Sequence, residues 1–166
     1  METPPIVQGM NPSTTINFFY SGLREVIGER IVSQDEILHV SSVLASFALT
    51  SCEASPTIAP LRALSELSQK TDFGPEAIFA HEIGKIASAQ CLFLNGFFRD
   101  QMRREHNLGL YDQLGSSFYL LARESAEGPR QRALFDEMSR KFTLWARYCC
   151  ALHRTLRKNQ VHYRMH

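Results

Sequence analysis

The sequence lacks any long apolar run and any recognisable export signal. No stretch approaches the roughly 20 consecutive apolar residues that cross a bilayer, so we expect no membrane span and no membrane partner. The opening METPPIVQGMNPS contains Glu2 and the adjacent prolines Pro4 and Pro5 but neither a basic start nor an apolar core. We therefore expect a flexible N-terminal tail over residues 1–13 rather than a signal peptide, and a cytoplasmic protein.

Cysteine is scarce, and its placement does not resemble a disulfide framework. The four cysteines, Cys52, Cys91, Cys149 and Cys150, lie within apolar, helix-like stretches rather than in short cysteine-dense loops. This placement favours reduced thiols in an intracellular setting.

Motifs of catalysis and phosphate binding are also missing. The sequence contains no Gly-x-Ser-x-Gly, no phosphate loop and no Gly-x-Gly-x-x-Gly. Asp72-Phe73-Gly74 spells the metal-binding tripeptide of kinases, but its companion motifs are absent, which indicates a turn. We expect no cofactor, and the sequence favours a protein that is not an enzyme without deciding the question.

Carboxylates are absent from residues 142–166, which hold five Arg or Lys and three His. The net charge is only +1, because charge is split along the chain. Residues 1–80 hold four Arg or Lys against nine Asp or Glu, whereas residues 81–166 hold fourteen against eight. The acidic first half is thus the neighbour that we expect for the basic end of the chain.

Helical periodicity runs through most of the chain, and no segment reads as a convincing β-strand. Apolar residues recur at spacings of three and four after capping signals, among them Ser/Thr residues 13–15 and the capping box Ser33-x-x-Glu36. The expected helices cover approximately 14–28, 33–48, 60–70, 75–104, 111–121 and 129–158. The sequence therefore predicts an all-α, single-domain bundle of about six helices over 14–158, with long central helices at 75–104 and 129–158 and a basic tail over 159–166.

The expected last helix carries a heptad seam of apolar side chains. Its members recur at alternating spacings of three and four: Phe135, Met138, Phe142, Trp145, Cys149, Leu152 and Leu156. Such a seam suits either the core of a bundle or an interface between subunits. Exposure of Leu144, Tyr148 and Phe98 in the monomer would add an apolar patch typical of an interface.

A stripe of cations lies opposite this seam. At about 100° per residue, Arg140, Arg147, Arg154 and Lys158 fall on one side of the helix. The stripe could bind a polyanion such as nucleic acid, or an acidic partner, or it could be the solvated face that any bundle helix needs. The sequence pI of 7.7 favours the solvated face over nucleic acid.

Two further patterns are weaker. Glu36 and His39 share a helix face as Glu-x-x-His, and with His81 and Glu82 they are weak candidates for a metal site in the bundle, but the second Glu-x-x-His of di-iron bundles is missing. Cys149 and His153 are one turn apart without a second Cys pair. Residues 64–83 resemble a helix-turn-helix, yet the first turn of the second helix offers no side chain that reads bases, which favours an ordinary αα-corner.

The function that these patterns favour is a non-catalytic helical interaction module, an adaptor or regulator that binds a protein partner and forms a homodimer. A nucleic-acid-associated regulator that uses the basic stripe and tail is the first alternative. A metal-binding or ligand-binding bundle enzyme is the second.

Overall fold

The structure is a computed structural model that describes residues 11–49 and 75–164, with side chains over 11–49 and 83–160. Every element in these ranges is a helix, and no strand occurs among them, so the predicted all-α fold is confirmed. The expected helix at 60–70 lies outside the described residues. The seven described helices are α1 (Pro12–Ile27), α2 (Gln34–Leu49), α4 (Pro75–Phe97), α5 (Arg99–Glu105), α6 (Leu108–Arg123), α7 (Pro129–Arg140) and α8 (Phe142–Arg164).

Side-chain caps define where α1 and α2 begin. Asn11, rather than the expected Ser/Thr, caps α1, because its Oδ1 accepts a hydrogen bond of 2.9 Å from the amide of Thr14. Ser33 Oγ accepts a bond of 3.2 Å from the amide of Asp35 and begins α2. The predicted capping box is not completed, since the side chain of Glu36 turns into the core instead.

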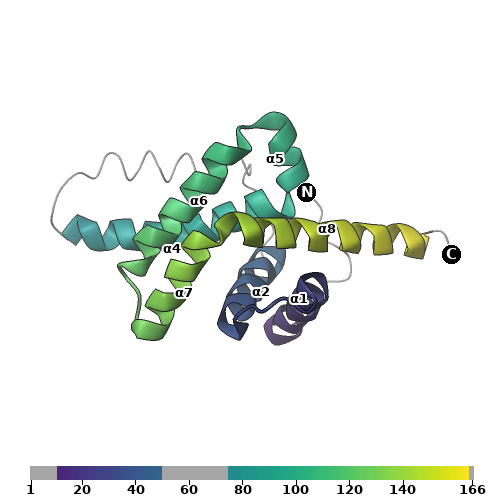
Figure 1. Cartoon of the computed structure of the whole chain (residues 1–166), viewed down its shortest axis with the longest axis horizontal. Coiled ribbons are helices and arrows are strands. Elements are labelled where there is room, and N and C mark those ends of the chain that lie inside the picture. Colours follow the sequence, from purple (N-terminus) through teal and green to yellow (C-terminus); the bar gives the residue numbers. More distant parts are fainter. Residues whose placement is uncertain (1–10, 50–74, 165–166) are drawn as a thin grey trace.

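The expected long helix over 75–104 is interrupted at Phe98. That residue has φ −107° and ψ 26°, outside the helical range, and the chain changes direction between α4 and α5 (Figure 1). The amide of Phe98 still bonds to the carbonyl of Leu94, and the amide of Met102 to that of Phe98. The apolar spacing therefore continues across the break, which is why the sequence pattern did not reveal it.

The expected helix over 129–158 is interrupted in the same way at Lys141, with φ −103° and ψ 15°. The bends at Phe98 and Lys141 turn two predicted long helices into four, and this accounts for the larger helix number. Helix α7 begins at Pro129 after Gly128, and α8 continues to Arg164. Helical structure thus extends past the expected bounds 14 and 158 at both ends.

Helix α8 lies along the length of the molecule, as Figure 1 shows. Helices α1 and α2 pair with each other and lie below α8 in the view of Figure 1, and α6 packs on both α4 and α7. Helix α5 contacts α8 near the middle of α8. Helices α1, α4, α5, α6 and α7 pack on α8, and α2 contacts α8 through the hydrogen bond from Trp145 to Glu36. Glu36 also binds Lys141, at the junction of α7 and α8.

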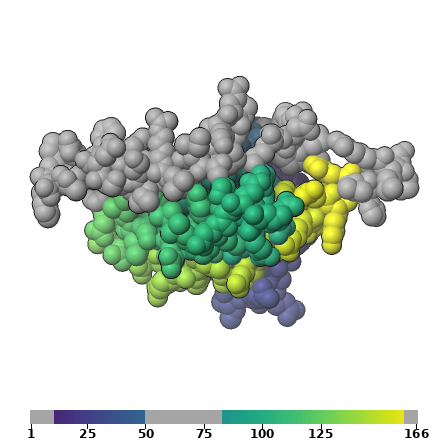
Figure 2. Space-filling view, turned by 90° about the horizontal axis from the view of Figure 1, so that it is seen from above, coloured from purple at the N-terminus to yellow at the C-terminus, as the bar shows by residue number. Residues whose placement is uncertain are grey.

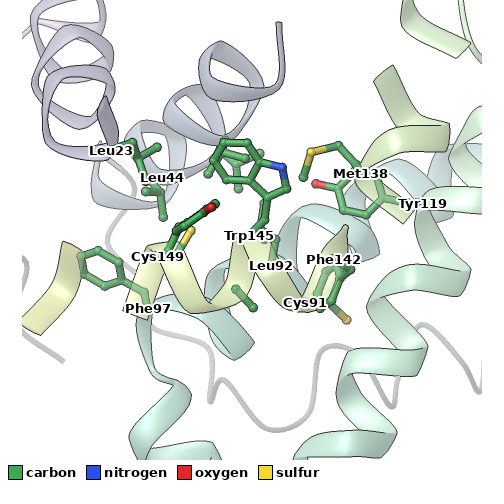
Figure 3. Close-up of a cluster of buried hydrophobic side chains, with 14 of the residues drawn as sticks. Leu23, Leu44, Cys91, Leu92, Phe97, Tyr119, Met138, Phe142, Trp145 and Cys149 are labelled. Carbon is green, nitrogen blue, oxygen red and sulfur yellow. The ribbon is translucent and has the colours of Figure 1, made fainter. Parts of the chain in front are cut away.

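Trp145 of α8 occupies the centre of the core. Its side chain is fully buried, with Leu23 and Leu44 on one side and Met138 and Tyr119 on the other (Figure 3). Close contacts between helices depend on small residues. At Gly115 of α6, a Cβ atom would stand 2.2 Å from the ring of Phe142, so only glycine lets α6 approach α8 so closely.

Candidate functional site

Glu36 is a buried carboxylate where α2 meets the junction of α7 and α8. Its side chain is 3% exposed. Oε2 accepts a bond of 2.8 Å from the indole nitrogen of Trp145, and Oε1 one of 3.0 Å from Nζ of Lys141. Burial of a charge is costly unless it is paired and hydrogen-bonded, and both conditions are met here. The group therefore joins three helices.

His39, one turn further along α2, is likewise engaged. Its Nε2 lies 2.8 Å from the hydroxyl of Tyr119, and its ring meets Phe135 edge-on at 5.9 Å between centroids. Burial lowers the pKa of His39 to about 4, and burial also raises the pKa of Tyr119. Both side chains are uncharged at neutral pH and form a polar contact between α2 and α6.

The metal hypothesis grouped Glu36 and His39 with His81 and Glu82. The first two are directed at separate partners on different helices, as described above. The side chains of His81 and Glu82 lie outside the described residues. Within the described part of the chain, no group of three or more His, Cys, Asp or Glu could hold a metal ion. The metal site stays a hypothesis.

The three described cysteines are free thiols in or near the core. Burial raises the pKa of both Cys91 and Cys149 to about 12 and also raises that of Cys150. A buried thiol with a raised pKa is a poor nucleophile and a poor metal ligand. His153 stacks on Phe97 at 4.4 Å, so Cys149 and His153 serve as core and near-core packing.

A second internal ion pair joins the other side of the bundle. The guanidinium of Arg99, on α5, donates to both carboxylate oxygens of Asp112 on α6, at 3.1 and 3.0 Å. The two side chains are 6% and 12% exposed. Like Glu36, this pair ties helices together across a break in the chain, because Arg99 follows the interruption at Phe98.

The heptad seam lies inside the chain. Six of its members are buried at 6% exposure or less, from Phe135 through Leu152, and Leu156 is partly buried. Of the two readings of the seam, the structure shows the intrachain core. The apolar patch that exposure of Leu144, Tyr148 and Phe98 would create does not form either. Leu144 is 40% exposed, but Tyr148 is only 5% exposed and Phe98 is partly buried.

The basic stripe is not continuous. The break at Lys141 places Arg140 on α7, where it pairs with Asp136 and Glu137 of its own helix. On α8, Arg154 donates to Asp100 of α5 through Nε at 3.0 Å and through a terminal nitrogen at 2.6 Å. The partners of Arg140 and Arg154 thus come from the second half of the chain, and the expected pairing with the acidic first half was wrong for these two residues.

Exposed cations of α5 and α8 together form one surface, which we call the basic edge. Asp100 of α5 lies next to α8, because it bonds to Arg154. The positive charges of Arg154, Arg103 and Arg104 lower the pKa of Asp100. The basic edge consists of Arg103, Arg104, Arg147, Arg154, Arg157 and Lys158, all of them exposed. Sequence reasoning missed the two residues from α5. The adjacent pair Arg103-Arg104 was a visible signal, but its proximity to α8 depends on the break at Phe98.

Comparisons with known proteins add no relative, because the chain matches no protein-family model, no curated protein and no solved structure. Among the residues that the structure describes, no helix is both long and apolar enough for a membrane span.

Proposed function

We propose that the protein is a non-catalytic helical interaction module, an adaptor or regulator that binds a macromolecular partner. The observation that carries this proposal is that buried ionisable side chains bond within the fold, whereas most cations of the basic edge do not. The ionisable side chains in the interior, such as Glu36, His39 and Arg99, bond to side chains of neighbouring helices, whereas five exposed cations without an ion pair in the described part of the chain lie on the basic edge. The interior chemistry supports the fold, and the exposed chemistry is available to a partner.

The basic edge is the binding surface in this proposal. Five of its six cations, all except Arg154, have no ion pair within the described part of the chain. Cations that the fold does not use for pairing are suited to an anionic partner. We also expect the protein to act in the cytoplasm, an expectation that rests on its free thiols.

Self-association remains a prediction with a separate test. The prediction of self-association rested on an exposed apolar surface, and it is weaker now because the heptad seam and Tyr148 are buried within one chain. Multi-angle light scattering of the purified chain measures the molar mass directly. A mass of twice 18.9 kDa would support the homodimer, and a strict monomer would remove self-association from the proposal while leaving the basic edge in place.

The interaction proposal is tested by affinity purification after chemical cross-linking, with and without nuclease. The edge variant carries Arg103→Glu and Arg157→Glu, one change from each helix. A matched control variant carries Arg24→Glu and Arg132→Glu, two exposed arginines away from the edge. We expect a partner that the wild type and the control capture and the edge variant loses. Capture of no macromolecule, or equal capture by the edge and control variants, would contradict the proposal.

A further inference from the structure

We infer that the basic edge binds the sugar–phosphate backbone of nucleic acid. This inference rests on the proposed function and names the class of its partner. The composition of the edge, its position on α8 and the single carboxylate within it support this partner.

The composition of the edge is that of a phosphate-binding surface. Five of its six cations are arginines, whose planar guanidinium donates two parallel hydrogen bonds to an oxyanion. Over the part of α8 whose side chains are described, residues 142–160, the only exposed large apolar side chain is Leu144, and α5 has none. Protein interfaces have an apolar core from which charged residues are depleted, whereas nucleic-acid interfaces are polar and strongly positive. The edge resembles the second kind.

The edge lies on the face of α8 that is turned away from α1. Leu152 packs against Gly22 of α1, where a Cβ on the glycine would stand 2.7 Å from the leucine side chain. At about 100° per residue, Arg154 points about 160° away from Leu152, so α1 lies on the opposite face of α8 from the edge. In Figure 2 the surface of α5 and α6 (green) continues onto the yellow end of α8. A long ligand can therefore contact both helices.

The spacing along α8 suits a repeating polyanion. Arg147 and Arg154 are two turns apart, or about 10 Å, and Lys158 follows after about 6 Å more. Arg157 lies on the same side of the helix, within an arc of about 100°. The cations thus form a row rather than a single pocket, which suits successive phosphates better than one small anion.

The pI of the whole chain does not describe this surface. Two acids of the first half pair elsewhere, because Asp35 binds Arg130 and Glu36 is buried with Lys141. The second acid of α5, Glu105, lies next to His106 at 3.9 Å. Salt screens exposed charges over about 8 Å, so a phosphate at the edge interacts mainly with the edge itself. The near-neutral pI of the whole chain therefore does not argue against phosphate binding at the basic edge.

Asp100 competes with a phosphate group for the guanidinium of Arg154. Its two oxygens occupy Arg154 in the way that two phosphate oxygens would. Both side chains are about half exposed, at 48% and 56%, so a phosphate can displace the carboxylate. Neutralising this residue removes the competing charge while the amide can still accept from Arg154. The variant Asp100→Asn is therefore expected to bind nucleic acid more tightly.

The test is fluorescence anisotropy with a labelled 20-nucleotide single-stranded DNA, the matching RNA and the duplex, over a salt series. Four or more phosphate contacts give a slope of log affinity against log salt of about −3 to −4. At low salt we expect the edge variant Arg103→Glu/Arg157→Glu to lose at least about tenfold in affinity. The control Arg24→Glu/Arg132→Glu should stay within about twofold, and Asp100→Asn should gain affinity. Circular dichroism of each variant verifies that the fold is intact.

Poly-L-glutamate serves as the protein-like polyanion in the same assay. Undetectable binding of all three nucleic acids at low salt would overturn the inference, as would equal losses in the edge and control variants. Binding of polyglutamate as tight as that of nucleic acid would overturn it too. In those cases a nuclease-resistant partner that the edge variant loses in the affinity purification would still support the interaction module. Failure of both experiments would remove both proposals.

Discussion

The indole nitrogen of Trp145 lies 2.8 Å from a carboxylate oxygen of Glu36, a residue 109 positions earlier in the chain. Both side chains are buried. The bond places the first described helix pair against the start of α8, where Lys141 contributes the charge that balances the carboxylate. One polar contact thereby joins two distant parts of the sequence.

Substitution Glu36→Ala should lower the free energy of unfolding by about 2–4 kcal/mol. The change leaves the Trp145 N–H without an acceptor in the core and removes the partner of Lys141. Urea denaturation followed by circular dichroism measures the effect. Asp35→Asn is the matched control, because the neighbouring Asp35 makes an exposed pair with Arg130 and its loss should change stability far less. Equal effects in the two variants would contradict a special role for the buried carboxylate.

Substitution Gly115→Ala should destabilise the protein by about 1–3 kcal/mol, because the added methyl group would overlap the ring of Phe142. Gly109, in the same helix, is the control, since a Cβ there would meet only Asn107 Oδ1 at 3.5 Å. Gly109→Ala should be neutral or stabilise by up to about 1 kcal/mol. Thermal unfolding of the two variants compares them directly. Combining Gly115→Ala with Phe142→Leu should recover part of the loss, and no recovery would point to a different cause.

Cys91 and Cys149 should resist alkylation while the protein is folded. Their pKa values of about 12 and their complete burial leave almost no accessible thiolate at pH 8. Iodoacetamide labelling followed by peptide mass spectrometry assigns the extent of reaction to each cysteine. Both sites should be labelled fully after denaturation in urea, which is the internal control. Rapid native labelling of Cys149 would show that the centre of α8 opens readily.

Stability should fall as the pH drops from about 6.5 to about 4. His39 is neutral when folded and has a pKa of about 4, whereas its pKa in the unfolded chain is near 6.5. In this interval the unfolded state binds a proton that the native state does not, so the free energy of unfolding rises with pH, by up to about 3 kcal/mol in total. Urea denaturation at several pH values measures this slope.

The matched variant for this slope is His39→Gln, which should show a shallower dependence over the same interval. Burial also lowers the pKa of His153, so a smaller dependence of the same sign should remain. An unchanged slope in His39→Gln would show that other groups control the acid sensitivity.

The helices themselves could be predicted from the sequence, because their apolar residues recur at helical spacing and the same spacing buries them. Phe142, Trp145 and Cys149, for example, are buried as one side of α8. The breaks at Phe98 and Lys141 could not be predicted in this way. Backbone hydrogen bonds continue on both sides of each break, so the periodicity is preserved while the direction changes.

The basic edge was only partly predictable for the same reason. Arg147, Arg154 and Lys158 share one face of one helix, which spacing alone reveals. Arg140 was grouped with them only because the break was not visible. The contribution of α5 depends on the Asp100 contact with Arg154, a tertiary relationship that spacing within a helix does not encode.

The chain contains one tryptophan, and that residue is wholly buried beside Glu36. Its intrinsic fluorescence is therefore a reporter of a single place, the meeting point of α2, α7 and α8. Far-ultraviolet circular dichroism, in contrast, averages over every helix. If the two signals change at the same denaturant concentration, the bundle unfolds as one cooperative unit. If the fluorescence changes at a lower concentration, the part of the molecule joined by Glu36 separates before the helices melt.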